Sequence, residues 1–253
     1  MPLKHSHEVR SSVLDGPSVD TSPSSELPWA RDDWDTWFPP GIYARLGHRL
    51  LDLFLLAATA PLTLPLLMLL GIVNAYANRN QGGALFHQDR VGWRGQVFSL
   101  VKFRTMAPAA DGSAKMRVTR FGRFLRNTHL DELPQIAHVL SGRMSFIGPR
   151  PEMLEIEAWA AEVVPAFSRR LAIRPGITGL AQITQGYTER EPKAYRDKLR
   201  INDSYLVRMS LHRDLWVLGR TFVWMLRARG WRTSGQENNL HFLGESAPQR
   251  KAG

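Results

Sequence analysis

Two adjacent carboxylates, Asp131 and Glu132, stand directly after a row of arginines in this chain. Arg120, Arg123 and Arg126 are three residues apart, so on a helix they would form a slanted row of guanidinium groups suited to phosphate contacts. Carboxylates beside a phosphate site are typical of metal binding or covalent catalysis, because an ionised carboxylate can hold Mg²⁺ or attack phosphorus. An isolated Asp-Glu pair is usually a helix cap or a surface pair, so the chemical interpretation rests on the basic residues around it.

The carboxylate pair is expected at the N-terminus of a helix. Thr128 and Asp131 have the spacing of a capping box, or Asp131 is itself the N-cap, which would place Pro134 harmlessly in the first turn. The helix would run to about Ser141 and end at Gly142. In either case, free amides and the positive end of the helix dipole would stabilise an ionised aspartate and attract phosphate oxygens.

Two loops further along the chain carry residues suited to ligand binding. In Gly148-Pro149-Arg150-Pro151 the prolines fix the backbone and remove competing donors, so the Arg150 guanidinium would be rigidly presented. The segment from Arg174 to Gln182 contains Gly176 and Gly179, and it would form either a simple turn or a loop whose amides approach a ligand. The sequence contains no glycine-rich nucleotide loop, histidine pair at metal spacing or serine nucleophile elbow.

The composition indicates a polyanionic partner. The chain has 253 residues with 33 Lys and Arg against 23 Asp and Glu, a net charge of +10, and this excess suits nucleic acid, anionic lipid or a phosphorylated substrate. Nucleic-acid surfaces usually interleave basic with aromatic or small polar residues, whereas here two carboxylates follow the basic row. The absence of cysteine excludes disulfides and cysteine-ligated zinc or iron–sulfur clusters.

One segment belongs in a membrane. Residues 53–78 contain no charged side chain, and a bilayer core needs about 20 apolar residues as a helix. Pro61 and Pro65 near its middle predict a sharp break, and basic residues on both flanks predict that both ends face the cytoplasm. We therefore expect a re-entrant helix–break–helix hairpin over residues 41–80. The alternative is one kinked span in which Thr59 and Thr63 satisfy the freed carbonyls.

The remaining pattern predicts an α+β fold that is predominantly helical. Alternating apolar residues between positions 85 and 107 indicate a short β-hairpin, followed by a loop over 107–114. Helical patterns cover residues 121–126, 132–141, 152–171 and 193–209. The catalytic domain would span residues 81–232, between a disordered leader at 1–40 and a flexible tail at 233–253. Tryptophans 29, 34 and 37 suggest that the end of the leader docks on the body or lies at a bilayer interface.

The last helix has the pattern of a basic amphipathic helix. Its apolar residues fall at spacings of three and four, and they are Leu211, Leu215, Leu218, Phe222 and Met225. Arg213, Arg220 and Arg227 recur on another face, with Trp216, Trp224 and Trp231 between them. This pattern suits a helix lying in the plane of an anionic membrane surface, and the alternative is an ordinary core-facing helix with a solvated basic face.

Four motifs in consistent order give the chain a resemblance to a known family. They are Lys102–Met106, Arg120–Gln135, Gly142–Glu152 and Arg174–Gly179. Together they resemble the bacterial sugar transferases, which are monotopic polyprenyl-phosphate phosphoglycosyl transferases, and their length suggests the members that initiate exopolysaccharide assembly. The resemblance covers about residues 45 to 230.

The resemblance implies transfer of a sugar 1-phosphate from a UDP-sugar to a polyprenyl phosphate with Mg²⁺, releasing UMP, at the cytoplasmic face of the bacterial inner membrane. Asp131 would be the nucleophile that forms an aspartyl-phosphosugar intermediate, and Glu132 would help hold the metal. Arg126 and Arg150 would bind phosphates, and Lys102 and Arg104 would line the site. The family's membrane helix usually breaks at Ser-Pro, whereas this chain has Ala60-Pro61.

The partners implied are the UDP-sugar, undecaprenyl phosphate and membrane lipid, with no nucleic acid. A homodimer is one option, and the sugar, the glycan pathway and the oligomeric state stay open. A second hypothesis is a membrane-anchored basic protein that binds anionic lipid or nucleic acid without catalysis, in which the carboxylate pair only caps a helix.

Overall fold

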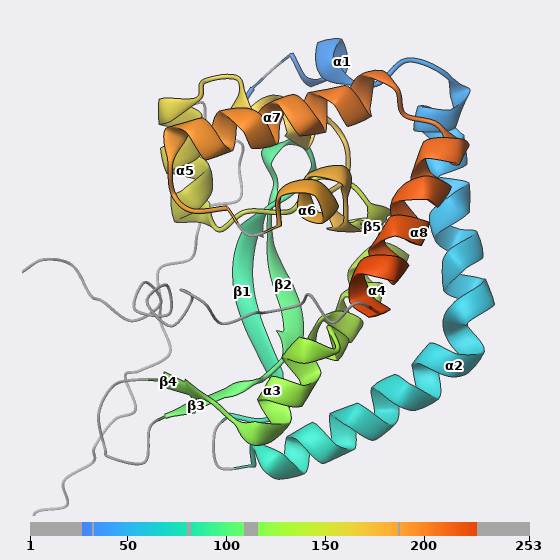
Figure 1. The fold of residues 1–253 in the computed structure, drawn as a ribbon, viewed down its shortest axis with the longest axis vertical. Coiled ribbons are helices and arrows are strands. Elements are labelled where there is room, and N and C mark those ends of the chain that lie inside the picture. The colour runs from blue at the N-terminus through green and yellow to red at the C-terminus, as the bar shows by residue number, and fades with distance from the viewer. Residues whose placement is uncertain (1–26, 32, 80–81, 109–115, 187, 227–253) are drawn as a thin grey trace, which may run out of the picture.

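The computed structural model describes residues 27–31, 33–79, 82–108, 116–186 and 188–226 (Figure 1). The helices are α1 (Trp34–Trp37), α2 (His48–Ala77), α3 (Arg120–Asn127), α4 (Ile136–Leu140), α5 (Leu154–Val163), α6 (Leu180–Gln185), α7 (Pro192–Val207) and α8 (Leu211–Leu226). The strands are β1 (Leu85–Val91), β2 (Val97–Phe103), β3 (Met106–Pro108), β4 (Met116–Val118), β5 (Ser145–Ile147) and β6 (Gly176–Thr178). The expected α+β class, mostly helical, is confirmed. The expected tail at 233–253 lies outside the described residues.

The predicted hairpin is formed by β1 and β2, which pair antiparallel from Leu85 opposite Phe103 to Val91 opposite Val97. In β2, Phe98 and Leu100 are buried with Ser99 exposed between them, as the period of two in the sequence predicts, whereas Phe103 is buried out of this alternation. Gly95 in the connecting turn has a φ of 76°, a conformation that glycine adopts without strain. The hairpin carries the end of β2 toward the carboxylate pair.

The predicted break in the membrane segment is not observed. α2 is one continuous helix through Pro61 and Pro65, and it bends instead (Figure 1). Pro61 cannot donate a hydrogen bond to the Ala57 carbonyl, and Pro65 cannot donate one to the Pro61 carbonyl. The loss of these two bonds bends the long helix without ending it. The hydroxyls of Thr59 and Thr63 bond the carbonyls of Leu55 and Thr59, which are not the carbonyls that the prolines free. Such back-bonding by threonine also favours a bend.

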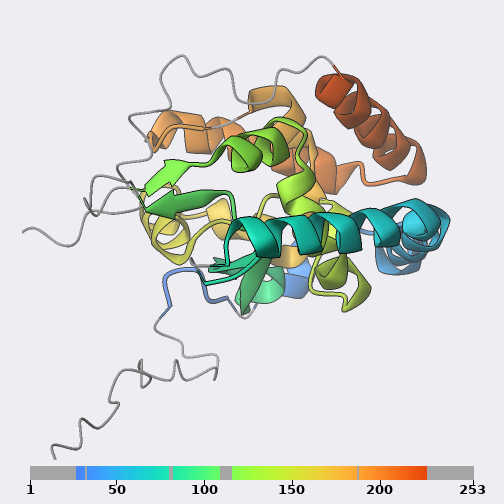
Figure 2. The ribbon, with the colours of Figure 1, turned by 90° about the horizontal axis from the view of Figure 1, so that it is seen from below.

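Both ends of α2 contact the same globular body, while its middle is exposed. Near its start, Asp52 Oδ1 accepts from Ser145 Oγ at 2.8 Å and from the Phe146 amide at 2.9 Å. Near its end, Asn74 Nδ2 donates to the Ala84 carbonyl at 2.6 Å. Leu62 between them is 75% exposed. Among the described residues, Tyr43–Ala77 is the one helical segment long and apolar enough to cross a membrane, and α2 lies along the outside of the body in both views (Figures 1 and 2).

The tryptophan segment before α2 docks on the body. The Trp29 indole donates to the Gly95 carbonyl at 3.2 Å, and Trp29 and Trp34 are both buried. Docking is therefore the alternative that the structure supports for this segment. Residues 1–26 of the expected leader lie outside the described residues.

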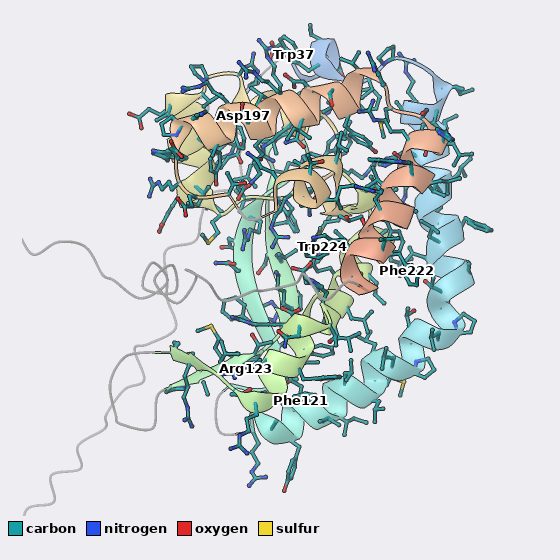
Figure 3. All side chains as sticks on the ribbon, viewed as in Figure 1. Trp37, Phe121, Arg123, Asp197, Phe222 and Trp224 are labelled. Atoms are coloured by element: carbon teal, nitrogen blue, oxygen red, sulfur yellow. The ribbon has the colours of Figure 1, made fainter. Side chains whose placement is uncertain are left out.

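α8 leaves most of its apolar face uncovered. Leu211, Leu215 and Phe222 are between 48% and 63% exposed, whereas Val217 and Asp214 on the other side are fully buried. Figure 3 shows Phe222 and Trp224 on opposite sides of the helix. The part of this helix expected beyond Leu226 lies outside the described residues.

Two other predictions need correction. The helix expected over 152–171 ends at Val163, and a 3₁₀ helix, η4 (Phe167–Ala172), follows Pro165. The loop expected over 107–114 begins inside β3, which pairs with β4 as a second hairpin. Strands of three residues are too short for their alternation to be recognised in the sequence.

Candidate active site

The carboxylate pair lies on a 3₁₀ helix, η3 (Leu130–Gln135), that packs against β2. The Lys102 ammonium, at the end of β2, lies 2.7 Å from Glu132 Oε1. Arg150 Nη2 lies 3.5 Å from the same oxygen. Three of the residues predicted for the site, from segments far apart in the chain, therefore meet at Glu132.

The predicted helix caps at the carboxylate pair are wrong. The residue before η3 is His129, whose φ of 55° is left-handed and whose side chain makes no capping bond. Thr128 Oγ1 instead donates to the Phe124 carbonyl at 2.8 Å, in the helix behind it. Asp131 and Glu132 therefore lie in the first turn of a 3₁₀ helix after a sharp turn from α3, and both remain available for chemistry.

The two carboxylates have opposite electrostatic environments. Burial, together with the neighbouring charge of Glu132, raises the pKa of Asp131 to about 6, against the opposing effects of Lys102 and Arg126. Burial alone would raise the pKa of Glu132 as well, but Lys102 and Arg150 lower it to about 2. Glu132 is thus fixed as a paired anion, and Asp131 is the carboxylate whose charge is least compensated.

The other predicted basic residues divide into two groups. Arg126 Nε donates to Thr105 Oγ1 at 2.8 Å, and its charge acts on Asp131, so it belongs to the site. Arg104 points away, since its guanidinium donates to the carbonyls of Gly83 and Leu85 at 3.0 and 2.8 Å. Arg120 and Arg123 are exposed on α3, where Figure 3 labels Arg123. The structure therefore brings Arg126, and not the whole arginine row, to the carboxylate pair.

The Arg150 loop is tied down through its carbonyl oxygens. The Pro149 carbonyl accepts from the Gly176 amide at 2.9 Å, the Arg150 carbonyl from Arg170 Nη1 at 2.9 Å, and the Pro151 carbonyl from Arg90 Nη1 at 3.2 Å. The sequence predicts that the two prolines hold the Arg150 loop rigid. Hydrogen bonds to three successive carbonyls of the loop also fix its backbone.

The glycines of the second loop serve close backbone packing. A Cβ on Gly176 would lie 2.1 Å from the Gly148 amide nitrogen, and one on Gly179 would lie 2.0 Å from the Gly148 carbonyl oxygen. The parallel pairing of β5 with β6 requires this approach. The Gly176 amide donates to the Pro149 carbonyl at 2.9 Å, and Gly176–Thr178 forms β6, so these glycines serve packing against the Arg150 loop.

Sequence reasoning missed several residues around the site. The ring of Trp224 from α8 lies 5.0 Å from the His129 ring, so the end of the amphipathic helix reaches the turn beside Asp131. Arg170 and Glu157 form a fully buried ion pair behind the Arg150 loop. Both residues have charged neighbours in the chain, Glu155 near Glu157 and Arg169 beside Arg170, so the sequence alone does not show which charge is buried.

The carboxylate pair fits Mg²⁺ that is shared with a phosphorylated ligand. Among the described residues, no three His, Cys, Asp or Glu side chains group as a metal site. Mg²⁺ commonly takes only one or two protein carboxylates and completes its shell with phosphate oxygens and water. The repulsion from Glu132 that raises the pKa of Asp131 is of the kind that a divalent cation relieves.

Together, the fold and the site place a half-buried carboxylate pair among basic side chains on a protein that carries a long exposed apolar helix. The sequence profile of the bacterial sugar transferase family matches residues 43–228. The chain therefore belongs to the bacterial sugar transferase family.

Named relatives support this assignment. A UDP-glucose:undecaprenyl-phosphate glucose-1-phosphate transferase of Caulobacter vibrioides is 36% identical over 212 residues, which cover 80% of this chain and 77% of that protein. A UDP-N-acetylgalactosamine-undecaprenyl-phosphate N-acetylgalactosaminephosphotransferase of Aeromonas hydrophila is 30% identical over 241 residues, which cover 92% of this chain and 54% of that protein. The chain thus spans about half the length of the Aeromonas relative.

Proposed function

We propose that this protein transfers a sugar 1-phosphate from a UDP-sugar to undecaprenyl phosphate, with UMP as the other product. The relatives named for this reaction, with glucose or N-acetylgalactosamine, support the two substrate classes. The observation that carries the proposal is that Asp131 adjoins Glu132, on which Lys102 and Arg150 converge at 2.7 and 3.5 Å, while the charge of Arg126 also acts on Asp131. The Asp131 carboxylate can act as a nucleophile there, because the surrounding basic side chains would hold a diphosphate beside it.

In the first step, an Asp131 oxygen attacks the phosphorus that carries the sugar. The bond from that phosphorus to the bridging oxygen breaks, and its electron pair leaves with UMP. The reaction needs Asp131 ionised and needs the negative charge on the phosphoryl oxygens to be offset. Lys102, Arg126 and Arg150 supply fixed positive charge around the pair.

In the second step, a phosphate oxygen of undecaprenyl phosphate attacks the same phosphorus. The aspartyl oxygen leaves with its electron pair, and the carboxylate is restored. No proton transfer is required in either step, because both attacking oxygens are already ionised. A covalent intermediate lets a soluble donor and a lipid acceptor use one small site in turn.

Mg²⁺ is proposed as the cofactor, held by Glu132 together with substrate phosphate oxygens. When bound, it would neutralise charge on the transferring group and on the departing nucleotide. Arg150 and Arg126 would orient the diphosphate, since a guanidinium can bind two phosphate oxygens at once.

We propose that α2 enters and leaves one leaflet from the cytoplasmic side of the inner membrane. Its two ends contact one globular body, which a straight span would hold on opposite sides of the bilayer. The exposed apolar face of α8 would lie in the same interface. The contact of Trp224 with His129 then links the membrane interface to the turn that precedes Asp131.

A non-catalytic basic surface for anionic lipid fits the geometry less well. It gives Asp131 no role, although burial and the charge of Glu132 raise the pKa of this carboxyl, a perturbation that is common at functional sites. The test is UMP release from a panel of UDP-sugars, with undecaprenyl phosphate and Mg²⁺, by the purified protein in detergent. The proposal predicts Mg²⁺-dependent release with at least one sugar, which continues beyond one UMP per protein only when the acceptor is present. No release with any sugar would reject it.

A further inference from the structure

A cluster of four charged side chains lies buried behind the Arg150 loop. Glu157 and Arg170 are 0% and 1% exposed, and Glu152 and Lys198 are each 7% exposed. Arg170 pairs with Glu157, and Lys198 pairs with Glu152. Buried charges lose their hydration, and apolar residues of similar volume often give equal or greater stability. The contacts of Arg170 indicate a functional role for this buried cluster.

One branch of the Arg170 guanidinium reaches the Arg150 loop. Its Nη1 donates to the Arg150 carbonyl at 2.9 Å, while Nη2 is held by Glu157. Pro149 and Pro151 have no amide proton, so at these positions the loop can be tied to the body only through carbonyl oxygens. An arginine suits this task, because its side chain has donors only and can serve two acceptors at once.

We infer that Arg170 is a positioning residue for the phosphate-binding guanidinium of Arg150, and that Glu157 fixes Arg170 in that role. The inference rests on the proposed function, which assigns Arg150 to a substrate phosphate. Arg150 Nη2 lies 3.5 Å from Glu132, so movement of the loop backbone would carry the guanidinium away from the carboxylate pair. A misplacement of about 1 Å can cost on the order of a hundredfold in rate.

A double-mutant cycle tests the inference. Arg170→Lys keeps a charge for Glu157 but loses the second branch that reaches the Arg150 carbonyl. With the preferred UDP-sugar of the panel, we expect kcat/KM to fall about tenfold in the native background and less than about twofold in an Arg150→Ala background. An equal loss in both backgrounds, or no loss in the native one, would overturn the inference.

A separate control variant tests whether a loss of stability alone would lower the activity. Val164→Ala shortens a buried side chain in the adjoining core of α5, η4 and α7 without changing a charge, so it should lower Tm without a tenfold loss of kcat/KM. If Arg170→Lys fails to fold, Glu157→Gln replaces it, because the amide still accepts from Arg170 but carries no charge. We then expect about a threefold loss in the native background and none with Arg150→Ala, and equal losses would again overturn the inference.

The outcome is distinguishable from failure of the proposed function. Asp131→Asn reports on that function alone, because Asp131 has no contact with the buried cluster in the interactions described. Full turnover by Asp131→Asn would reject the covalent mechanism whatever the cycle gives. Loss of turnover in Asp131→Asn together with an additive cycle would reject only the role of Arg170.

Discussion

The Lys102 ammonium lies 2.7 Å from Glu132 Oε1 and joins strand β2 to the 3₁₀ helix that carries the carboxylate pair. Strand β1, the partner of β2, is the next strand after α2, and Asn74 in the last turns of α2 donates to the carbonyl of Ala84, the residue before β1. The apolar helix, the hairpin and the carboxylate pair are therefore one connected unit. Pairing with Lys102 also keeps Glu132 ionised, which leaves Asp131 with a raised pKa beside it.

The pH dependence of the first half-reaction should report Asp131. Its pKa is raised to about 6, so below that pH the carboxyl is protonated and cannot attack. The rate constant of the single burst of UMP release should therefore fall as the pH drops through about 6. The measurement omits the lipid acceptor, whose phosphate titrates in the same range. Arg126→Gln removes a charge that lowers this pKa, so it should move the acid limb to higher pH. An acid limb that stays in place in Arg126→Gln would contradict the assignment.

Replacement of Arg150 should reduce turnover. Arg150→Ala should lower kcat/KM at least about tenfold, corresponding to about 1.4 kcal/mol for a lost charge-assisted contact. Arg150→Lys should also lose activity, because an ammonium cannot reproduce the bidentate fork. Arg123→Ala, which removes an exposed arginine of α3, is the matched control and should keep near-native kinetics. Native kinetics in both Arg150 variants would show that this guanidinium binds no substrate.

The interlocked loops should tolerate no side chain at Gly176. A Cβ there would lie 2.1 Å from the Gly148 nitrogen, so Gly176→Ala must force the loops apart and should cost more than about 2 kcal/mol of unfolding free energy. Gly219→Ala is the control, because no heavy atom lies within 4 Å of its Cβ position in α8. It should raise the stability by about 0.5–1 kcal/mol. Thermal unfolding in one detergent compares the two, and equal Tm values would contradict the packing described.

Both ends of α2 should face the cytoplasm. Thr36 and Asp89 are exposed on either side of the helix, and the chain has no native cysteine to confuse labelling. Single cysteines at these positions should both resist a membrane-impermeant thiol reagent in intact cells and both react after permeabilisation. Labelling of position 36 alone in intact cells would mean a spanning helix, and it would leave the catalytic assignment untouched.

The sequence predicted the features that depend on local patterns. Alternation predicted the pairing partners β1 and β2, helical spacing predicted α7 and α8, and the charge gap over 53–78 predicted the exposed apolar helix. The motif residues Lys102, Glu132 and Arg150 do converge, although their spacing in the chain is long.

Features that depend on tertiary contacts were not predictable. The left-handed conformation of His129 is tolerated inside a packed turn, and no residue type in the sequence indicates it. Arg104 fits the basic pattern of the site, yet backbone carbonyls that become available only in the folded chain hold it elsewhere. Likewise, Pro61 and Pro65 predict a disturbed helix, but the neighbouring packing decides between a bend and a break.

Covalent catalysis by Asp131 is tested by the intact mass of the protein after mixing with the preferred UDP-sugar and Mg²⁺, without acceptor. We expect an added mass of one phosphosugar on the native chain, its loss when undecaprenyl phosphate is supplied, and no adduct on Asp131→Asn. Steady UMP release with no adduct under any quench condition, or an adduct of the same mass on Asp131→Asn, would contradict covalent catalysis by Asp131.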